Sequence, residues 1–176
     1  DWKISEARQK DTFKPSEIKD VLYRPFDCRK IYYSSNLIDF GRENVMQHFL
    51  KGENLGLCFN RQIEQQRLFA DVFITSELFT LHSLSLKESN NIAPLYLYPE
   101  NTSQKLLETP VRTPNLNPEI LRQIADKLGL TFVSEKTIDE DEHLAFAPID
   151  LLDYIYAVLH SPNYRETYKE FLKIDF

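Results

Sequence analysis

The sequence predicts an α+β domain, with a mostly antiparallel sheet in the N-terminal half and helices in the C-terminal half packed on that sheet. Between residues 20 and 98, short apolar segments rich in aromatic and β-branched residues alternate with polar turns, which is typical of strands. After residue 116, apolar residues recur at the spacing of one helix face. A chain of 176 residues is long enough to bury a core of its own.

The chain is expected to divide into a short tether and one domain. Residues 1–19 are polar and mixed in charge, and we expect them to be the tether. Residues 20–176 form the predicted domain, in which residues 20–98 are strand-rich and residues 99–176 are mainly helical.

Strands are expected at each apolar segment of the first half. Residues 21–23 and 31–33 should pair as a hairpin, because Pro25 and Asp27 between them favour a turn. The loop that follows is expected to pack Phe40 inward. Four further strands are predicted, at residues 55–60, 69–75, 79–86 and 92–98.

Helices are predicted where apolar residues recur three and four positions apart. They span residues 42–50, residues 117–128, residues 149–160 and a segment that begins at Pro162. The second of these has clear boundaries, because Asn117 suits the N-cap, Pro118 the first helical position and Gly129 the C-terminal end. A short strand is expected at residues 130–133.

The charge of the chain is unevenly distributed. The formal net charge is −6, which by itself argues against a nucleic-acid partner. Residues 1–67, however, carry +2, whereas residues 68–176 carry −8. A basic face in the N-terminal part would permit DNA binding without demonstrating it.

No segment points to a membrane or to the secretory pathway. No apolar run reaches the length of a membrane span, and no signal peptide is visible, so we expect a cytoplasmic protein. The first residue is Asp1 rather than Met, from which we expect a piece of a longer chain. Cys28 and Cys58 form no disulfide framework and are expected to be small buried side chains.

The sequence contains no pattern that indicates catalysis, a metal site or a cofactor site. Only four glycines are present, and none forms a Gly-rich phosphate-binding loop. The four histidines and two cysteines match no zinc spacing. The acidic run at residues 139–142 is expected to be a solvated loop. We therefore expect no catalytic residue, no metal ligand and no cofactor.

The hairpin at residues 23–33 is the first candidate contact region. Arg24, Arg29 and Lys30 should lie at or beside its end, where cations on a stiff turn would meet phosphates or base edges. In the alternative interpretation, the aromatic residues of the hairpin belong to the core and its arginines pair with Asp27 or Asp20.

The connection at residues 61–67 is the second candidate. It carries two arginines and three glutamines between two apolar strands, and arginine suits guanine as glutamine suits adenine in the major groove. The predicted contact residues are Arg61, Gln62, Gln65, Gln66 and Arg67, together with His82 from the following segment. Specificity is therefore expected to reside in residues 60–68 and 76–91. The alternative is an exposed connection with ordinary polar residues.

Residues 23–33 (YRPFDCRKIYY) resemble a motif in the C-terminal specificity region of Type ISP restriction–modification enzymes. Further segments resemble later blocks of that family in the same order, so that the resemblance covers roughly residues 20–176. These blocks are residues 42–50, 54–57, 69–75, 94–98, 114–118, 154–165 and 171–176. Family chains continue beyond the final Ile-Asp-Phe segment, whereas this sequence stops there, which again leads us to expect an excised domain.

The resemblance implies a target recognition domain that reads double-stranded DNA. In that family, nuclease, translocase and adenine methyltransferase parts lie upstream in one polypeptide, so the methyltransferase and nuclease domains would be partners in the same chain. Base contacts vary with the target, and no base-reading residue is carried over. Arg24, Arg29 and Lys30 lie in the shared motif, which fits backbone contacts or a structural role better than base reading.

Two other functions are considered. A scaffold domain that docks the methyltransferase region would show scattered cations rather than a basic concave face formed by Arg24, Arg29, Arg61 and Arg67. A hydrolase with a dispersed site would show a cleft that holds two close carboxylates and a lysine.

Overall fold

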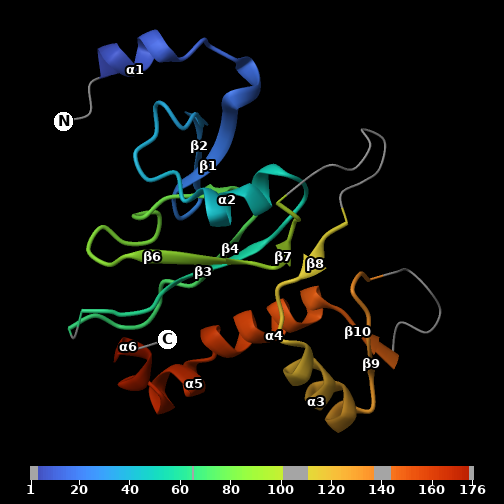
Figure 1. Ribbon diagram of the computed structural model, residues 1–176. Helices are drawn as coiled ribbons and strands as arrows, with labels where there is room; N and C mark the ends of the chain where they lie inside the picture. Colours follow the sequence, from blue (N-terminus) through green and yellow to red (C-terminus); the bar gives the residue numbers. More distant parts are fainter. Residues whose placement is uncertain (1–3, 65, 101–110, 137–143, 175–176) are drawn as a thin grey trace.

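The computed structural model describes residues 4–64, 66–100, 111–136 and 144–174 (Figure 1). Its helices are α1 (Ile4–Lys10), the 3-10 turn η1 (Pro15–Glu17), α2 (Glu43–Leu50), α3 (Pro118–Leu128), α4 (Pro148–His160), α5 (Pro162–Thr167) and α6 (Phe171–Ile174). Its strands are β1 (Ile18–Arg24), β2 (Asp27–Tyr32), β3 (Gly56–Asn60), β4 (Phe73–Thr75), β5 (Leu78–Phe79), β6 (Asn90–Pro94), β7 (Tyr96–Leu97), β8 (Thr113–Pro114), β9 (Thr131–Phe132) and β10 (Ala145–Phe146). The predicted α+β class is confirmed.

The strands form several small sheets rather than the single sheet that the sequence suggests. Strands β2-β1-β5 make one sheet and β4-β3-β6 another, while β7 pairs with β8 and β9 with β10. The ladders of the β4-β3-β6 sheet are antiparallel, whereas β5 joins β1 in parallel. The hairpin is longer than predicted, because β1 begins at Ile18, inside the segment expected to be a tether. Phe13 also stacks on Tyr32 of β2 with ring centroids 5.5 Å apart.

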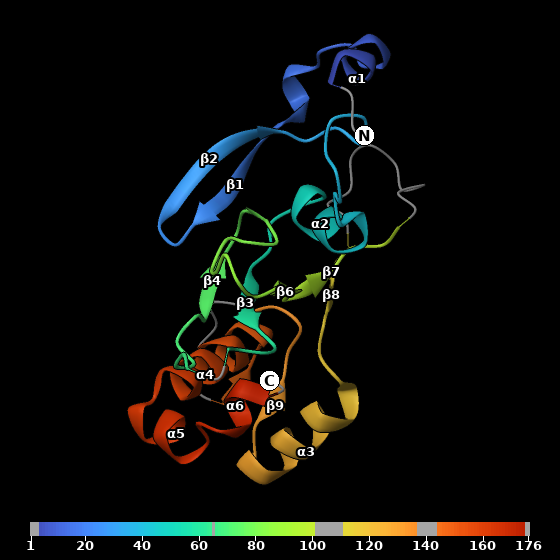
Figure 2. The same cartoon turned by 90° about the vertical axis from the view of Figure 1, so that its left-hand side faces the viewer.

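Strand β3 is buried on both faces and joins two halves of the core. Leu57 belongs to a cluster that contains Leu152 of α4 and Leu172 of α6. Its neighbour Cys58 points to the opposite face and belongs to a cluster that contains Val21 of β1 and Met46 of α2. Side chains alternate across a strand, so this arrangement places α4 to α6 on one face of the sheet and α2 with the hairpin on the other. Figures 1 and 2 show these two layers.

The predicted strand at residues 79–86 is wrong beyond Phe79. Side chains there satisfy the backbone groups that a ladder would otherwise pair. The Asn90 Oδ1 atom accepts from the backbone N–H groups of Leu84 and Ser85, at 2.7 and 3.1 Å. Ser83 Oγ accepts from the Thr80 N–H at 3.0 Å and donates to the Leu22 carbonyl. A series of turns therefore replaces the strand.

The remaining local predictions are mostly confirmed. The side chain of Asn117 accepts from two backbone N–H groups at the start of α3, and Gly129 ends that helix with φ 67°. The predicted strand at residues 69–75 shortens to β4, and the one at residues 92–98 divides into β6, which lies at a sheet edge, and β7. Cys58 is buried as expected.

Two burial predictions are wrong. Cys28 is exposed, because β2 is an edge strand and residues 28–30 face solvent. Phe40 is 80% exposed, and its positive φ of 56° marks a tight turn in the loop that carries it.

Within the described residues, no helix is long and apolar enough to cross a membrane. The acidic run at residues 139–142 lies outside the described residues.

Candidate nucleic-acid interface

The hairpin ends in a turn of two residues. Arg24 and Asp27 are partners in the ladder, so Pro25 and Phe26 alone make the turn. Proline presets its own φ, whereas Phe26 has φ 63°, in a region that favours glycine or asparagine. Phe26 is 93% exposed, and its ring makes a T-shaped contact with the ring of Phe73 in β4, with centroids 5.6 Å apart.

Cations surround this turn, and their side chains are paired. Arg29 makes an ion pair with Asp27 at 2.7 Å, and Lys30 makes one with Asp20 at 2.6 Å. The hydrogen bond from Arg29 holds the pKa of Asp27 below its ordinary value. All four side chains are between 40% and 67% exposed, so these pairs lie in solvent. The predicted pairing is thus confirmed for Arg29 with Asp27, while Asp20 takes a lysine instead of an arginine.

The expectation that the hairpin aromatics belong to the core is wrong at the tip. Tyr23 is 37% exposed, and two guanidinium groups lie over its ring. The centre of the ring is 4.2 Å from the Arg24 guanidinium carbon and 3.9 Å from that of Arg29. Arg24 also donates to the carbonyl of His82 at 2.9 Å. This contact joins the hairpin to the segment that contains the predicted contact residue His82.

The two segments predicted to carry specificity, residues 60–68 and 76–91, lie side by side. Arg67 joins them, because its guanidinium donates to Ser85 Oγ and Asp71 Oδ2, each at 2.9 Å, and forms an ion pair with Glu88. Burial raises the pKa of Glu88, but hydrogen bonds from Ser85 and Arg67 outweigh burial, so that this pKa lies below its ordinary value. Arg67 is therefore a structural link between the segments. Its role in DNA contact remains a prediction.

Two buried asparagines support the same junction and were missed in the sequence. The Asn90 amide donates to Asn60 Oδ1 at 2.7 Å, and the Asn60 amide donates to Asp71 Oδ2 at 3.2 Å. Both asparagines are fully buried, at the paired ends of β3 and β6. The signal available in the sequence was an asparagine at the end of each of two neighbouring strands.

Ile63 anchors the 61–67 connection to the core. Its side chain is buried in the core cluster of Leu172, and its N–H donates to the carbonyl of Lys173 at 3.0 Å. The flanking side chains of Arg61, Gln62 and Glu64 are consequently exposed. Of the other predicted contact residues here, Gln66 is exposed and Gln65 lies outside the described residues.

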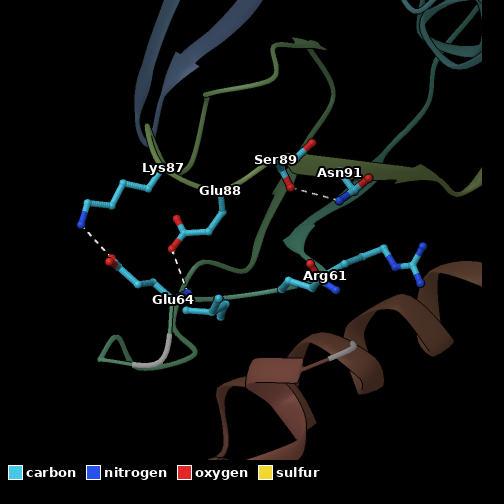
Figure 3. Close-up of a pocket in the computed structure, with 8 residues that line it drawn as sticks. Arg61, Glu64, Lys87, Glu88, Ser89 and Asn91 are labelled. Carbon is cyan, nitrogen blue, oxygen red and sulfur yellow. Dashed lines mark hydrogen bonds and ion pairs between the residues drawn. The ribbon is translucent and has the colours of Figure 1, made fainter.

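The first part of this connection, from Arg61 to Glu64, borders an open pocket of about 820 Å³ (Figure 3). It is lined by Arg61, Gln62, Ile63, Glu64, Lys87, Glu88, Ser89 and Asn91. At one end, Lys87 pairs with Glu64 at 2.7 Å, and the Glu64 N–H donates to Glu88. At the other end, the Arg61 side chain extends away from this charged group. The surface is therefore rich in hydrogen-bonding groups of mixed charge.

The pocket holds two carboxylates and a lysine, the arrangement considered for a hydrolase. Glu88, however, is held by Arg67 and Ser85, and Lys87 is held by Glu64. Among the described residues, no group of three or more His, Cys, Asp or Glu side chains is placed to hold a metal ion. The arrangement provides paired charges and amides on an open surface, which suits recognition of a polar ligand.

The cations do not form a uniformly basic concave face. The structure brings Arg24 into contact with His82, and Arg67 into contact with the 85–88 turn. Arg29 and Lys30 lie on β2, while Arg61 lies at the pocket. Segment 80–91 connects the hairpin to the pocket, and ion pairs along it join Arg67 to Glu88 and Lys87 to Glu64.

Comparison with known proteins places this architecture in a family. The Type ISP C-terminal specificity domain matches residues 1–176. None of the curated proteins matches the chain.

Solved structures with this fold are parts of much longer chains. A DrdV–DNA complex is 25% identical with a TM-score of 0.69, over 98% of this chain and 14% of the other. The ATP-dependent Type ISP restriction–modification enzyme LlaBIII bound to DNA is 19% identical with a TM-score of 0.69, over 99% of this chain and 10% of the other. A nuclease-deletion mutant of the Type ISP restriction–modification enzyme LlaGI, in complex with a DNA substrate mimic, is 24% identical with a TM-score of 0.56, over 94% of this chain and 12% of the other. This chain belongs to the Type ISP C-terminal specificity domain family.

Proposed function

We propose that this chain recognises a specific sequence in double-stranded DNA, as the specificity domain of a longer restriction–modification protein. The observation that carries the proposal is the likeness to the DrdV–DNA complex, which extends over 98% of this chain at 25% identity. The domain itself would be non-catalytic. Cleavage and adenine methylation would belong to nuclease and methyltransferase domains of the same polypeptide. Such a protein would act in the cytoplasm, where its DNA lies.

The exposure of each ion pair decides which cations are available to DNA. An ion pair in solvent adds little to stability because water screens it, so a phosphate can replace its carboxylate at little cost. Arg29, Lys30 and Lys87 are in such pairs, with side chains 57–67% exposed. Glu88, in contrast, is 8% exposed, and withdrawing Arg67 from it would leave a buried carboxylate without a cation. Phosphate contacts are therefore assigned to the first three cations.

Base reading is assigned to the 61–67 connection. Arg61 and Gln62 are exposed at the pocket and Gln66 is exposed further along the connection, which is fixed by buried Ile63 and by the Arg67 ion pair. Arginine and glutamine side chains can each make two hydrogen bonds to one base edge in the major groove. A fixed connection keeps these side chains in register with the bases that they contact.

A salt titration of the affinity of the parent protein for its target duplex and for a random duplex tests the proposal. The logarithm of affinity should fall linearly with the logarithm of salt concentration for both duplexes, and the target should bind at least ~10³-fold more tightly. Equal affinity for both duplexes would contradict specific recognition.

A scaffold function is the second candidate, because the cations are scattered rather than gathered on one basic concave face, which is the arrangement expected of a scaffold. Ile120 and Leu128 on α3 are 55% and 62% exposed, and Tyr154 on α4 is 67% exposed. These helices lie on the far side of the β4-β3-β6 sheet from the hairpin (Figure 2). If docking were the only role, Ile120→Asp would weaken association with the methyltransferase part, and substitutions at the pocket rim would leave DNA affinity unchanged.

A further inference from the structure

The hairpin tip carries a bulky aromatic ring where the fold does not need one. Phe26 is the second residue of a two-residue turn and has φ 63°, a conformation that glycine or asparagine adopts with less strain. A bulky residue with positive φ is an outlier that calls for an explanation. Burial supplies none, because Phe26 is 93% exposed and its one ring contact in the described structure is a T-shaped contact with Phe73.

The tip is a rigid support for this ring. Pro25 fixes the backbone before Phe26, and the ladder resumes directly at Arg24 and Asp27. The Arg24 guanidinium lies over the Tyr23 ring and is bonded to the His82 carbonyl, which ties the tip to the body of the domain. A ring on such a turn keeps its position when it meets a ligand and loses little conformational freedom.

The charge around the ring identifies the chemistry of the ligand. The hairpin, residues 18–32, holds four Lys or Arg and two Asp, a net charge of +2 in a chain of −6. Arg29 and Lys30 on β2 stand in solvent-exposed ion pairs that a phosphate can replace. The exposed apolar ring is therefore flanked by cationic side chains that can exchange a carboxylate for a phosphate. This combination suits a ligand with flat apolar faces and a polyanionic backbone, and nucleic acid has both.

We propose that Phe26 is a wedge that enters the base stack of bound duplex DNA, while Arg29 and Lys30 contact the adjacent phosphates. This inference rests on the proposed DNA-recognition function and specifies how the hairpin takes part in it. A ring on a two-stranded tip can enter a groove ahead of its strands and unstack one base step. Insertion removes both faces of the ring from water, which one apolar contact in a groove would not do.

The test uses the restriction–modification protein that carries this domain and its target duplex. The fluorescent base 2-aminopurine is placed at each position of the target in turn, apart from the adenine that is methylated. Wild-type protein should raise its fluorescence at one step, because unstacking relieves quenching. Phe26→Gly should abolish this signal and weaken binding roughly 5- to 150-fold, the range for loss of one base–aromatic stack. Phe26→Trp should keep both the fluorescence rise and the affinity for the target.

Two further variants separate the loss of the wedge from damage to the fold. Phe26→Asn also suits a positive φ and should match Phe26→Gly in every readout, with no fall in melting temperature. Phe40→Gly is the matched control, because Phe40 is likewise exposed with positive φ but lies outside the hairpin. It should leave both affinity and fluorescence unchanged.

Each remaining outcome overturns the wedge. If wild-type protein prefers its target but the Phe26→Gly variant binds that target as tightly as wild type does, the wedge is wrong and the proposed function stands. If Phe26→Gly binds weakly but no position brightens with wild type, the ring contacts a groove wall without unstacking. If the Phe26→Gly variant matches wild type in DNA affinity and in 2-aminopurine fluorescence but its specificity domain no longer packs on the methyltransferase part, the ring is a protein contact. If wild type shows no preference for its target, the wedge and the proposed function fail together.

Discussion

Replacing Arg67 with methionine should destabilise this chain far more than the same change at Arg61. Arg67→Met keeps most of the apolar stem but removes the guanidinium that contacts Asp71, Ser85 and Glu88. The carboxylate of Glu88, 8% exposed, would lose its cation, and Asp71, 19% exposed, would lose a charged donor.

The magnitude follows from the burial of these groups. Breaking a fully buried pair costs about 3–5 kcal/mol, and breaking one in solvent costs about 0–1 kcal/mol. The Arg67 side chain is 34% exposed, so the site lies between these limits. A loss of about 2–3 kcal/mol in the free energy of unfolding is expected, which corresponds to a fall of about 4–12 °C in Tm for a domain of this size.

Thermal unfolding of the 176-residue chain at pH 7, followed by circular dichroism, measures this effect. Arg61→Met should change the free energy of unfolding by less than about 0.5 kcal/mol, as expected for an exposed side chain. Glu88→Gln in the Arg67→Met background should recover about 1–2 kcal/mol, because a neutral amide needs no counter-ion. A Tm shift below about 2 °C for Arg67→Met, or no recovery in the double variant, would refute the proposed structural link.

Three further predictions follow from the same geometry. At Glu135 a hydrogen bond from Arg112 holds the pKa below the ordinary 4.5, and at Glu88 burial is outweighed by hydrogen bonds from Ser85 and Arg67, which also lower the pKa. The folded state therefore binds fewer protons at these two carboxylates, and their contribution to stability should be complete above about pH 5 and be lost as the pH falls below 4.5. Denaturant unfolding at pH 3, 4, 5 and 7 checks this sign, which equal stability at pH 3 and 7 would exclude. Phe26→Gly should leave the free energy of unfolding unchanged or raise it by about 1 kcal/mol, because relief of a positive φ outweighs the flexibility of glycine in the unfolded chain; a loss of about 3–5 kcal/mol by calorimetry would mean that the ring is packed after all. Arg61→Ala should cost about 1–3 kcal/mol of discrimination at one base pair of the target without changing Tm, and an unaltered sequence preference in a competition assay would remove Arg61 from the reading surface.

The elements with local signals could be predicted from sequence. Helix α3 was predicted within a residue, because Asn117 and Gly129 act on the backbone next to them. The hairpin was recognised from its turn residues, and the Arg29–Asp27 pair from residues two positions apart. Such features depend on a few neighbouring residues, and their chemistry can be read directly.

The parts that depend on distant contacts were not predictable in this way. Period-2 alternation at residues 79–86 suggested a strand, but Asn90 and Ser83 satisfy that backbone through side-chain hydrogen bonds. Arg67 looked like an exposed polar residue, because nothing local shows that Glu88 would fold against it. The exposure of Phe26 also depends on the hairpin tip standing clear of the core.

An exchange of specificity domains tests whether this domain reads the DNA sequence. In the parent protein, residues 1–176 would be replaced by the corresponding domain of LlaBIII, and both proteins would be used to select binding sequences from randomised duplexes. Each protein should enrich one motif, and the motif should change with the domain. The same motif from both proteins would show that the sequence is read elsewhere in the polypeptide and would contradict DNA recognition by this domain.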